Sequence, residues 1–137
     1  MTTRTIDPTG DDLKRIVATV AADTPVTMLN LLRFRDQAAY PATDDAKPCS
    51  GRDAYARYSR QALAHVRAVG GEPVVIAEVL GRFIGPDNED WDEMLLVRYP
   101  SLSAFLAMIG NPDYQAATIH RTAALADARL IVTRTPA

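Results

Sequence analysis

The segment at residues 26–34 constrains the fold more than any other part of the chain. Its apolar side chains occupy both alternating sets of positions, at Val26, Met28, Leu29, Leu31 and Leu32. Pro25 precedes the segment, and its short length favours a strand over a helix. A strand that is apolar on both sides is expected to be covered on both faces. The sequence therefore predicts a sheet with a packing layer against each face.

Capping residues and periodicity predict the other elements. Thr9 can cap a helix whose apolar residues follow at three- and four-residue spacing, and Gly70 and Gly71 end a second helical pattern. The turn-forming cluster at 85–90 separates two β-rich runs, which predicts a hairpin. The predicted helices are 10–21, 51–69, 101–109 and 111–125, and the predicted strands are 26–34, 73–84, 93–99 and 129–134.

Without the first helix, the element order is β-α-β-β-α-β, which is that of the ferredoxin-like fold. We expect one α+β domain over residues 1–137, with a core at about 25–134, an extra N-terminal helix at about 10–21, and a four-stranded antiparallel sheet. The main helices can cover only one sheet face, so the other face predicts a homodimer in which two sheets meet. Residues 35–50 contain two prolines and read as a long loop, of the kind that often forms a lid or an arm.

Composition narrows the classes of partner. The formal net charge is −2 and the 15 Lys and Arg residues are scattered, so nothing indicates binding to nucleic acid or to an anionic membrane. No apolar run is long enough to span a bilayer, and the start of the chain, Met1 to Gly10, does not resemble a signal peptide. The single cysteine, Cys49, cannot form an internal disulfide, which fits the cytoplasm. Cys49 is either a reactive nucleophile or an incidental loop residue.

Motifs for cofactors are missing from the sequence. No HExxH or CxxC motif is present, so no metal site is predicted. Neither a GxGxxG nor a GxxxxGK[ST] motif is present, so no nucleotide cofactor is predicted.

Five short segments carry a resemblance to a known family. They are Asn30-Leu31-Leu32-Arg33-Phe34, Arg98-Tyr99-Pro100-Ser101 with Phe105 and Met108, Asn111-Pro112-Asp113-Tyr114, His120-Arg121, and Leu125 to Leu130. Over about residues 25–134 the chain resembles the bacterial domain of unknown function numbered thirteen-thirty, in the dimeric α/β-barrel superfamily. The resemblance implies a ferredoxin-like monomer whose sheet packs on a partner's sheet. The superfamily includes cofactor-free monooxygenases, lactone isomerases and haem-degrading enzymes, but the resemblance assigns no catalytic residue.

Three polar residues interrupt the apolar strands and are candidates for a site. These are Asn30, Glu78 and Arg98. A buried polar group is costly unless it has a partner, so such residues either pair with one another or serve a ligand. In the functional reading, Arg98 binds a carboxylate, Asn30 donates to a carbonyl or enolate oxygen, and Glu78 is a base. In the structural reading, Glu78 forms an internal or dimer-interface salt bridge with an arginine such as Arg82 or Arg98.

Further candidates lie outside the strands. His120 can act as a general base near neutral pH, at the rim of a cleft between sheet and helices, or can be a structural residue. Arg121 and Trp91 are candidates for substrate binding, although Trp91 can equally cap the end of the hairpin, and His65 is expected to be structural. We therefore expect a small-molecule enzyme of the cofactor-free monooxygenase or isomerase type that acts on a small acidic or enolisable metabolite. The alternative is a non-catalytic dimeric module that binds a metabolite or has a stress-related structural role.

Overall fold

The computed structural model describes residues 4–136 of the chain. Its elements are α1 (Gly10–Thr19), β1 (Val26–Phe34), α2 (Gly51–Ala68), β2 (Glu72–Glu78), β3 (Glu93–Tyr99), α3 (Leu102–Ile109), α4 (Pro112–Ala124) and β4 (Leu125–Thr133). The helices begin where the sequence provides caps: the side chains of Thr9, Ser50, Ser101 and Asn111 each accept a hydrogen bond from a backbone N–H in the first turn.

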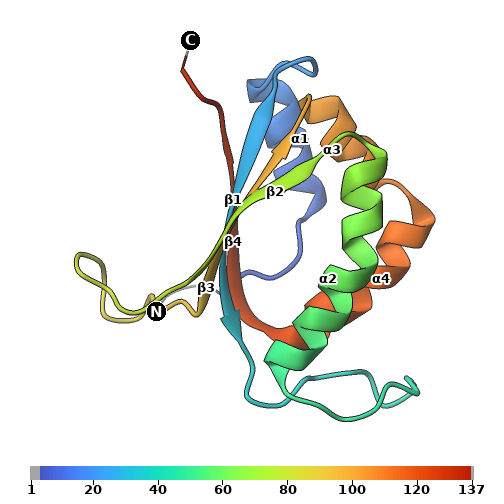
Figure 1. Ribbon diagram of the computed structural model, residues 1–137, viewed down its shortest axis with the longest axis vertical. Helices are drawn as coiled ribbons and strands as arrows, with labels where there is room; N and C mark the ends of the chain where they lie inside the picture. The colour runs from blue at the N-terminus through green and yellow to red at the C-terminus, as the bar shows by residue number, and fades with distance from the viewer. Residues whose placement is uncertain (1–3, 137) are drawn as a thin grey trace.

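The four strands form one antiparallel sheet in the order β2-β3-β1-β4. This order and the helix placement are those of the ferredoxin-like fold, so the predicted fold class is confirmed. Figure 1 shows the sheet edge-on, with α2 and α4 side by side over one face. The chain between β2 and β3 projects on the other side of the sheet.

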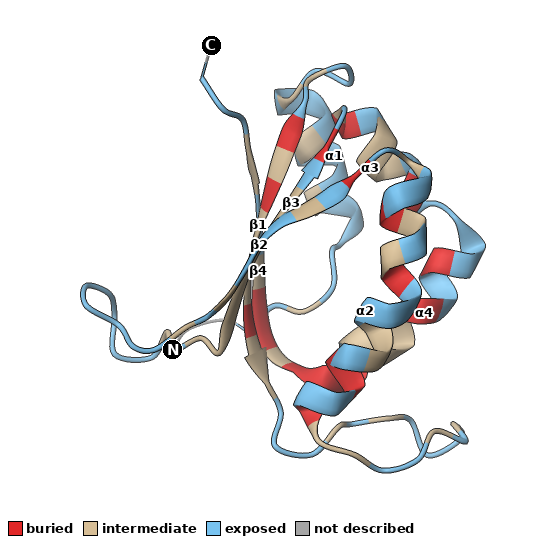
Figure 2. Ribbon diagram, in the orientation of Figure 1, coloured by how far each residue is buried: buried red, intermediate tan, exposed pale blue. Residues whose placement is uncertain are grey.

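Alternation along β1 decides which face the helices cover. Val26, Met28 and Leu32 are buried and pack against residues of α2, α3 and α4. Leu29 and Leu31 point to the opposite face, which no described helix covers (Figures 1 and 2). We call this second surface the open face. Its apolar residues, assigned by strand pairing, are Leu29, Leu31, Val75, Met94, Leu96 and Ile131.

The core consists of two clusters on the helix face. One surrounds Met28, Leu102 and Met108, and the other surrounds Leu32 and Leu125. Aromatic rings of α2 and α4 join the two, through contacts among Tyr55, Tyr58 and Tyr114. Burial of these apolar side chains supplies most of the free energy that holds the helices on the sheet.

Two of the predicted strand boundaries are wrong. β2 ends at Glu78 rather than at residue 84, because residues 80–84 extend into a solvent-exposed loop. β4 begins at Leu125 rather than at residue 129, directly after α4 and without a connecting loop. A buried run of small residues at the end of α4, Ala123 and Ala124, lets the chain turn into the sheet at that point.

The loop predicted over residues 35–50 connects β1 to α2. Backbone hydrogen bonds close its neck, and residues 36–50 form its body. Gly51 N–H donates to Arg35 O at 3.0 Å, and Ala38 N–H donates to Cys49 O at 2.9 Å. Ala39 N–H donates to Ala123 O at 2.8 Å, which fastens the loop to the end of α4. The loop is therefore held in place beside the helices rather than free of them.

No helix within residues 4–136 combines the length and the apolar character needed to cross a membrane.

Candidate functional site

The sheet register separates the residues that we expected to share a pocket. Asn30 pairs with Leu95 and lies on the helix face, whereas Arg98 pairs with Thr27 and lies on the open face. Residues directly opposite in an antiparallel pair point to the same side of the sheet. Asn30 and Arg98 therefore point away from each other, and the predicted cleft with both residues at its base is wrong. Apolar residues occupy both the odd- and the even-numbered positions of β1, so the sequence did not show which face each residue points to.

Asn30 lies in a part of the helix face that is incompletely covered. Its side-chain Nδ2 donates one long hydrogen bond, 3.4 Å, to Met28 O. Leu130, its neighbour on β4, points to the same face and is still 44% exposed. Ile76 lies in the same cross-strand row, at the other sheet edge, and is 66% exposed. This row runs between the two core clusters, so Asn30 is reachable from solvent.

Glu78 is on the helix face but does not join Asn30. Glu78 lies on the outer strand β2 and pairs with Glu93 of β3, in the row of Leu32 rather than that of Asn30. Two strand spacings and a two-residue offset place Glu78 and Asn30 about 12 Å apart. Glu78 is exposed and, within residues 4–136, forms no ion pair with Arg82 or Arg98. Arg82 instead pairs with Asp87 and Asp90 at 3.6 and 3.5 Å. The predicted internal salt bridge of Glu78 is therefore wrong, and a salt bridge at a dimer interface stays a prediction.

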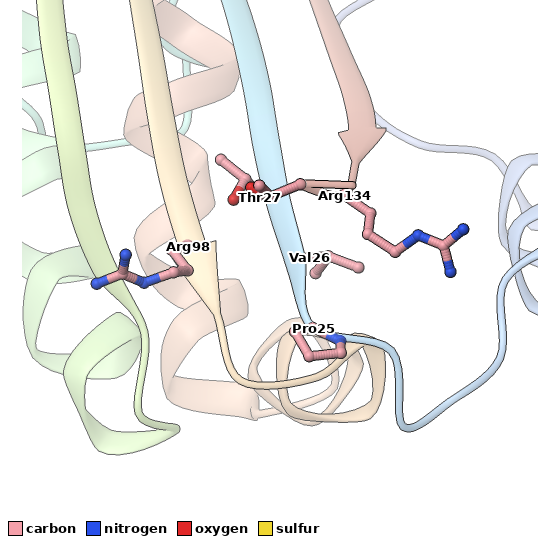
Figure 3. Close-up of a pocket in the computed structure, with 6 residues that line it drawn as sticks. Pro25, Val26, Thr27, Arg98 and Arg134 are labelled. Carbon is pink, nitrogen blue, oxygen red and sulfur yellow. The ribbon is translucent and has the colours of Figure 1, made fainter. Parts of the chain in front are cut away.

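Arg98 is exposed and borders a pocket at the end of the sheet where β1 begins. The pocket is lined by Pro25, Val26, Thr27, Arg98, Arg134 and Thr135. Figure 3 shows the guanidinium groups of Arg98 and Arg134 directed away from each other, on either side of the pocket. The two arginines do not converge on one point, so this arrangement does not form a carboxylate clamp.

Trp91 and Arg121 have structural partners. The Arg129 guanidinium lies over the Trp91 ring, 5.0 Å from its centroid, at the base of the β2–β3 connection. Arg121 donates to Ile6 O at 2.6 Å and lies 3.6 Å from Asp7, which ties the N-terminal segment to α4. Both contacts give these residues a role in holding segments of the chain together.

His120 is the one predicted site residue that belongs to a compact polar cluster. Tyr40 Oη and His120 Nδ1 are 2.6 Å apart, and Arg57 Nη1 donates to the same Tyr40 oxygen at 3.2 Å. The rings of Tyr40 and His120 meet edge to face, with centroids 5.6 Å apart. The Arg57 guanidinium also lies against the Tyr40 ring, at 5.6 Å. We call Tyr40, Arg57 and His120 the histidine cluster.

Three different elements build the histidine cluster. Tyr40 comes from the 36–50 loop, Arg57 from α2 and His120 from α4. The two helices lie side by side (Figure 1), and the loop is fastened to them by its neck and by the bond from Ala39 to Ala123. The cluster is thus fixed by backbone contacts on each of its three elements, which is what a preorganised site requires.

Electrostatics keep His120 neutral. Partial burial lowers its pKa below the usual 6.5, and the positive charge of Arg57 lowers the pKa further. Asp44 opposes this shift and Arg60 adds to it. A neutral imidazole has one nitrogen with a free lone pair, so His120 can accept a proton near neutral pH.

The bond to Tyr40 leaves Nε2 as the reactive nitrogen of His120. When Nδ1 carries the proton, it donates to Tyr40 Oη, which can accept from Arg57 through its second lone pair. Nε2 then has the lone pair of a general base. In the other tautomer Tyr40 donates to Nδ1, and Nε2–H is a hydrogen-bond donor. In both forms Nε2 is the nitrogen that can exchange a proton with a substrate, as an acceptor in the first tautomer and as a donor in the second.

Sequence reasoning found His120 but missed its partners. Tyr40 lies in a loop with no periodicity, and Arg57 lies on a helix among several other charged residues. The signal that could have drawn attention to Tyr40 is an aromatic residue placed inside an otherwise small and polar loop. No group of three or more His, Cys, Asp or Glu side chains within residues 4–136 is arranged to hold a metal ion.

Solved structures that match this chain include two forms of one bacterial protein. The structure of RPA0582, a protein of unknown function from Rhodopseudomonas palustris, has a TM-score of 0.88 and 37% identity, covering 98% of this chain and 99% of that one. The methylated form of RPA0582 has a TM-score of 0.89 and 38% identity, covering 99% of this chain and 98% of that one.

A more distant structure shares only the fold. It is a dimeric protein of unknown function and ferredoxin-like fold from Bacteroides fragilis, with a TM-score of 0.53 and 12% identity, covering 81% of this chain and 96% of that one. A search of curated proteins finds no match. The family described as domain of unknown function (DUF1330) matches residues 49–135, which include α2 to β4 and both helical members of the histidine cluster. This chain therefore belongs to the DUF1330 family.

Proposed function

We propose that the protein is a cofactor-free enzyme that moves a proton on a small acidic or enolisable metabolite, with His120 as its general base. The observation that carries this proposal is the 2.6 Å contact of His120 Nδ1 with Tyr40 Oη, together with the hydrogen bond from Arg57 to the same oxygen. A base that is held in one orientation and kept neutral by its surroundings is what such chemistry needs.

The proton transfer uses groups that the cluster supplies. His120 Nε2 takes a proton from the carbon next to a carbonyl, and the electron pair of the broken C–H bond becomes the enolate. The imidazolium that forms keeps its Nδ1–H bond to Tyr40 Oη. Return of the proton to the same carbon gives exchange. Where a second double bond is conjugated with the enolate, return of the proton to the far carbon of the dienolate moves the double bond and gives isomerisation, and neither step needs an oxidant.

The charge around His120 favours an anionic substrate. Arg57 and Arg60 both lower the pKa of His120, so both place positive potential at its ring, and Asp44 offsets only part of it. The same potential stabilises a carboxylate and the negative oxygen of an enolate. The expected substrates are therefore small oxo acids rather than neutral sugars or cationic amines.

Hydrogen–deuterium exchange tests the reaction directly. The protein is incubated in D₂O with a panel of small 2-oxo and 3-oxo carboxylates, and loss of the carbon-bound proton is followed by NMR. We expect exchange above background with wild type and a loss of about 100-fold or more in His120→Gln. His65→Gln is the matched control, because His65 lies against Tyr114 and outside the cluster.

Arg57→Gln adds a readout that does not depend on the substrate. Removing this positive charge should raise the midpoint of the His120 titration measured by NMR. If wild type exchanges no acid in the panel faster than the background rate, the catalytic proposal is wrong. If an acid shifts the His120 resonance without exchange, the site is a binding site, as in the non-catalytic alternative.

We further propose that the protein is a cytoplasmic homodimer that associates through the open face. The support is the apolar surface of that face, where Ile131 is 47% exposed and Val75 40% exposed at its two edges. A distant structure of the same fold is described as dimeric. A contiguous apolar sheet face of this kind is typical of a protein interface. The single cysteine fits a reducing compartment.

Light scattering at micromolar concentration tests the homodimer. One chain has a mass of 14.9 kDa. The measured mass should be twice this value for wild type and equal to it for Leu29→Arg. Leu29 lies opposite Leu96 at the centre of the open face, where a buried unpaired charge is most costly. A wild-type protein that is monomeric at this concentration would contradict the proposal.

A further inference from the structure

The chain between β2 and β3, residues 79–92, forms an arm with a firmly held base. Arg33 Nε donates to Asp90 O at 2.9 Å, and Arg129 Nη2 lies 3.2 Å from Glu89 Oε1. Asp92 accepts a hydrogen bond from Phe34 N–H through its carboxylate, at 2.8 Å. These contacts come from β1 and β4, so the base of the arm is attached to the centre and far edge of the sheet.

The arm lies on the side of the open face. Arg33 pairs with Asp127 and Arg129 pairs with Leu31, so both arginine side chains belong to the face opposite the helices. Figure 1 shows the arm projecting on that side, away from α2 and α4. A second copy that packs on the open face would therefore lie within reach of the arm.

The arm carries three large apolar side chains that are almost fully exposed. Phe83 is 100% exposed, Leu80 is 92% exposed and Ile84 is 90% exposed. No part of residues 4–136 covers these side chains, although bonds within the arm, such as that from Arg82 Nη1 to Pro86 O at 2.8 Å, give the segment a defined shape. Large apolar side chains grouped in this way are expected to be buried against a partner.

We infer that the arm of each copy packs its apolar side chains, Leu80, Phe83 and Ile84, against the other copy, so that the two protomers clasp each other across the open faces. This inference rests on the homodimer proposed above and adds a second contact region to it. A second copy is the fitting occupant because one two-fold axis buries both open faces and brings both arms to the partner. The interface would then combine a flat sheet contact with two apolar anchors at its edges.

The dissociation constant of the dimer tests the anchors. Leu80→Ser with Phe83→Ser should weaken the dimer by about 100-fold or more, measured by analytical ultracentrifugation, because two large apolar side chains lose their burial. Both residues are exposed within one chain. At a dilution where wild type and variant are both monomeric, the two proteins should therefore have the same melting temperature. Leu13→Ser is the matched control, because Leu13 is a half-exposed apolar residue on α1 and should leave the constant unchanged.

Trypsin provides an independent readout of the arm. The bond after Arg82 is a tryptic site beside Phe83. Its cleavage should be about tenfold or more slower in the wild-type dimer than in the monomeric Leu29→Arg variant, because burial against the partner protects it. If wild type is a dimer, but the arm variant has an unchanged dissociation constant and Arg82 is cleaved equally fast in both forms, the arm inference is overturned and the homodimer stands. A monomeric wild type overturns both.

Discussion

Gly51→Ala is expected to disrupt the junction that holds the loop of Tyr40 in place. Gly51 is buried at the first position of α2, where the ends of the 36–50 loop meet the end of α4. A Cβ atom at this position would overlap Arg35 O, and would lie 2.6 Å from Ala124 O and 2.7 Å from Arg35 N. All three are backbone atoms, which cannot rotate away as the end of a side chain can.

The magnitude follows from the contacts that must yield. Relieving the overlap separates Gly51 N–H from Arg35 O, now 3.0 Å apart, and strains the bond from Arg35 N–H to Ala124 O, now 2.8 Å. Each buried backbone group that loses its partner costs about 1–3 kcal/mol, and overpacking adds about 1–3 kcal/mol. With the two groups of the broken bond, the expected loss is about 3–9 kcal/mol, which is comparable with the roughly 5–15 kcal/mol that stabilises a domain.

Thermal and urea unfolding measure this loss. At about 2.1 cal/mol/K per residue, unfolding of 137 residues carries an entropy near 0.29 kcal/mol/K, so 3 kcal/mol lowers the Tm by about 10 °C. Gly10→Ala is the control, because no atom lies within 4 Å of a Cβ built there. The reasoning is refuted if Gly51→Ala melts within about 2 °C of wild type.

Two further predictions concern buried polar pairs. Tyr58→Phe should lower the free energy of unfolding in urea by about 1–2 kcal/mol, because it removes the 2.7 Å hydrogen bond between the hydroxyls of Tyr58 and Tyr114. The double variant Tyr58→Phe with Tyr114→Phe should lose no more than the single variant, since it leaves no hydroxyl without its partner. Additive losses would contradict this. For Asp127, burial alone would raise the pKa, but hydrogen bonds from Thr5 N–H and Arg129 hold the pKa below its usual value. The folded pKa is therefore lower than the unfolded one, so this stabilisation is present above about pH 4 and is lost as the pH falls toward the folded pKa. Asp127→Asn should cost about 1–3 kcal/mol at pH 7 and flatten the stability profile below pH 4, and an unchanged acid profile would refute the assignment.

The order of elements could be predicted because it is encoded locally. The N-caps Thr9, Ser101 and Asn111 and the Pro112 that follows the last of them stand at the helix starts in the sequence and do the same in the structure. The end of β2 could not be predicted in this way. Residues 79–84 have the composition of a strand but leave the sheet, and composition does not show whether a partner strand is present to pair with them.

The register of the sheet could not be predicted because β1 gives no sign of which face is inside. Both its parities are apolar, so Asn30 and Arg98 were equally compatible with one face or with two. The pairing of β2 adds a second obstacle, since the register shifts between Pro73 and Val75 and changes the face of every later residue. A one-residue ambiguity of this kind is enough to divide a predicted pocket in two.

The two faces of the sheet carry the two proposed sites separately. The histidine cluster belongs to the helix layer, where a loop and two helices meet, and it needs no residue from the open face. The open face carries Arg98 and the apolar surface, and the base of the arm is attached on its side. The proposed catalysis at His120 and the proposed association through the sheet thus rest on separate sets of contacts. Because the sheet lies between them, each proposal can fail without removing the support of the other.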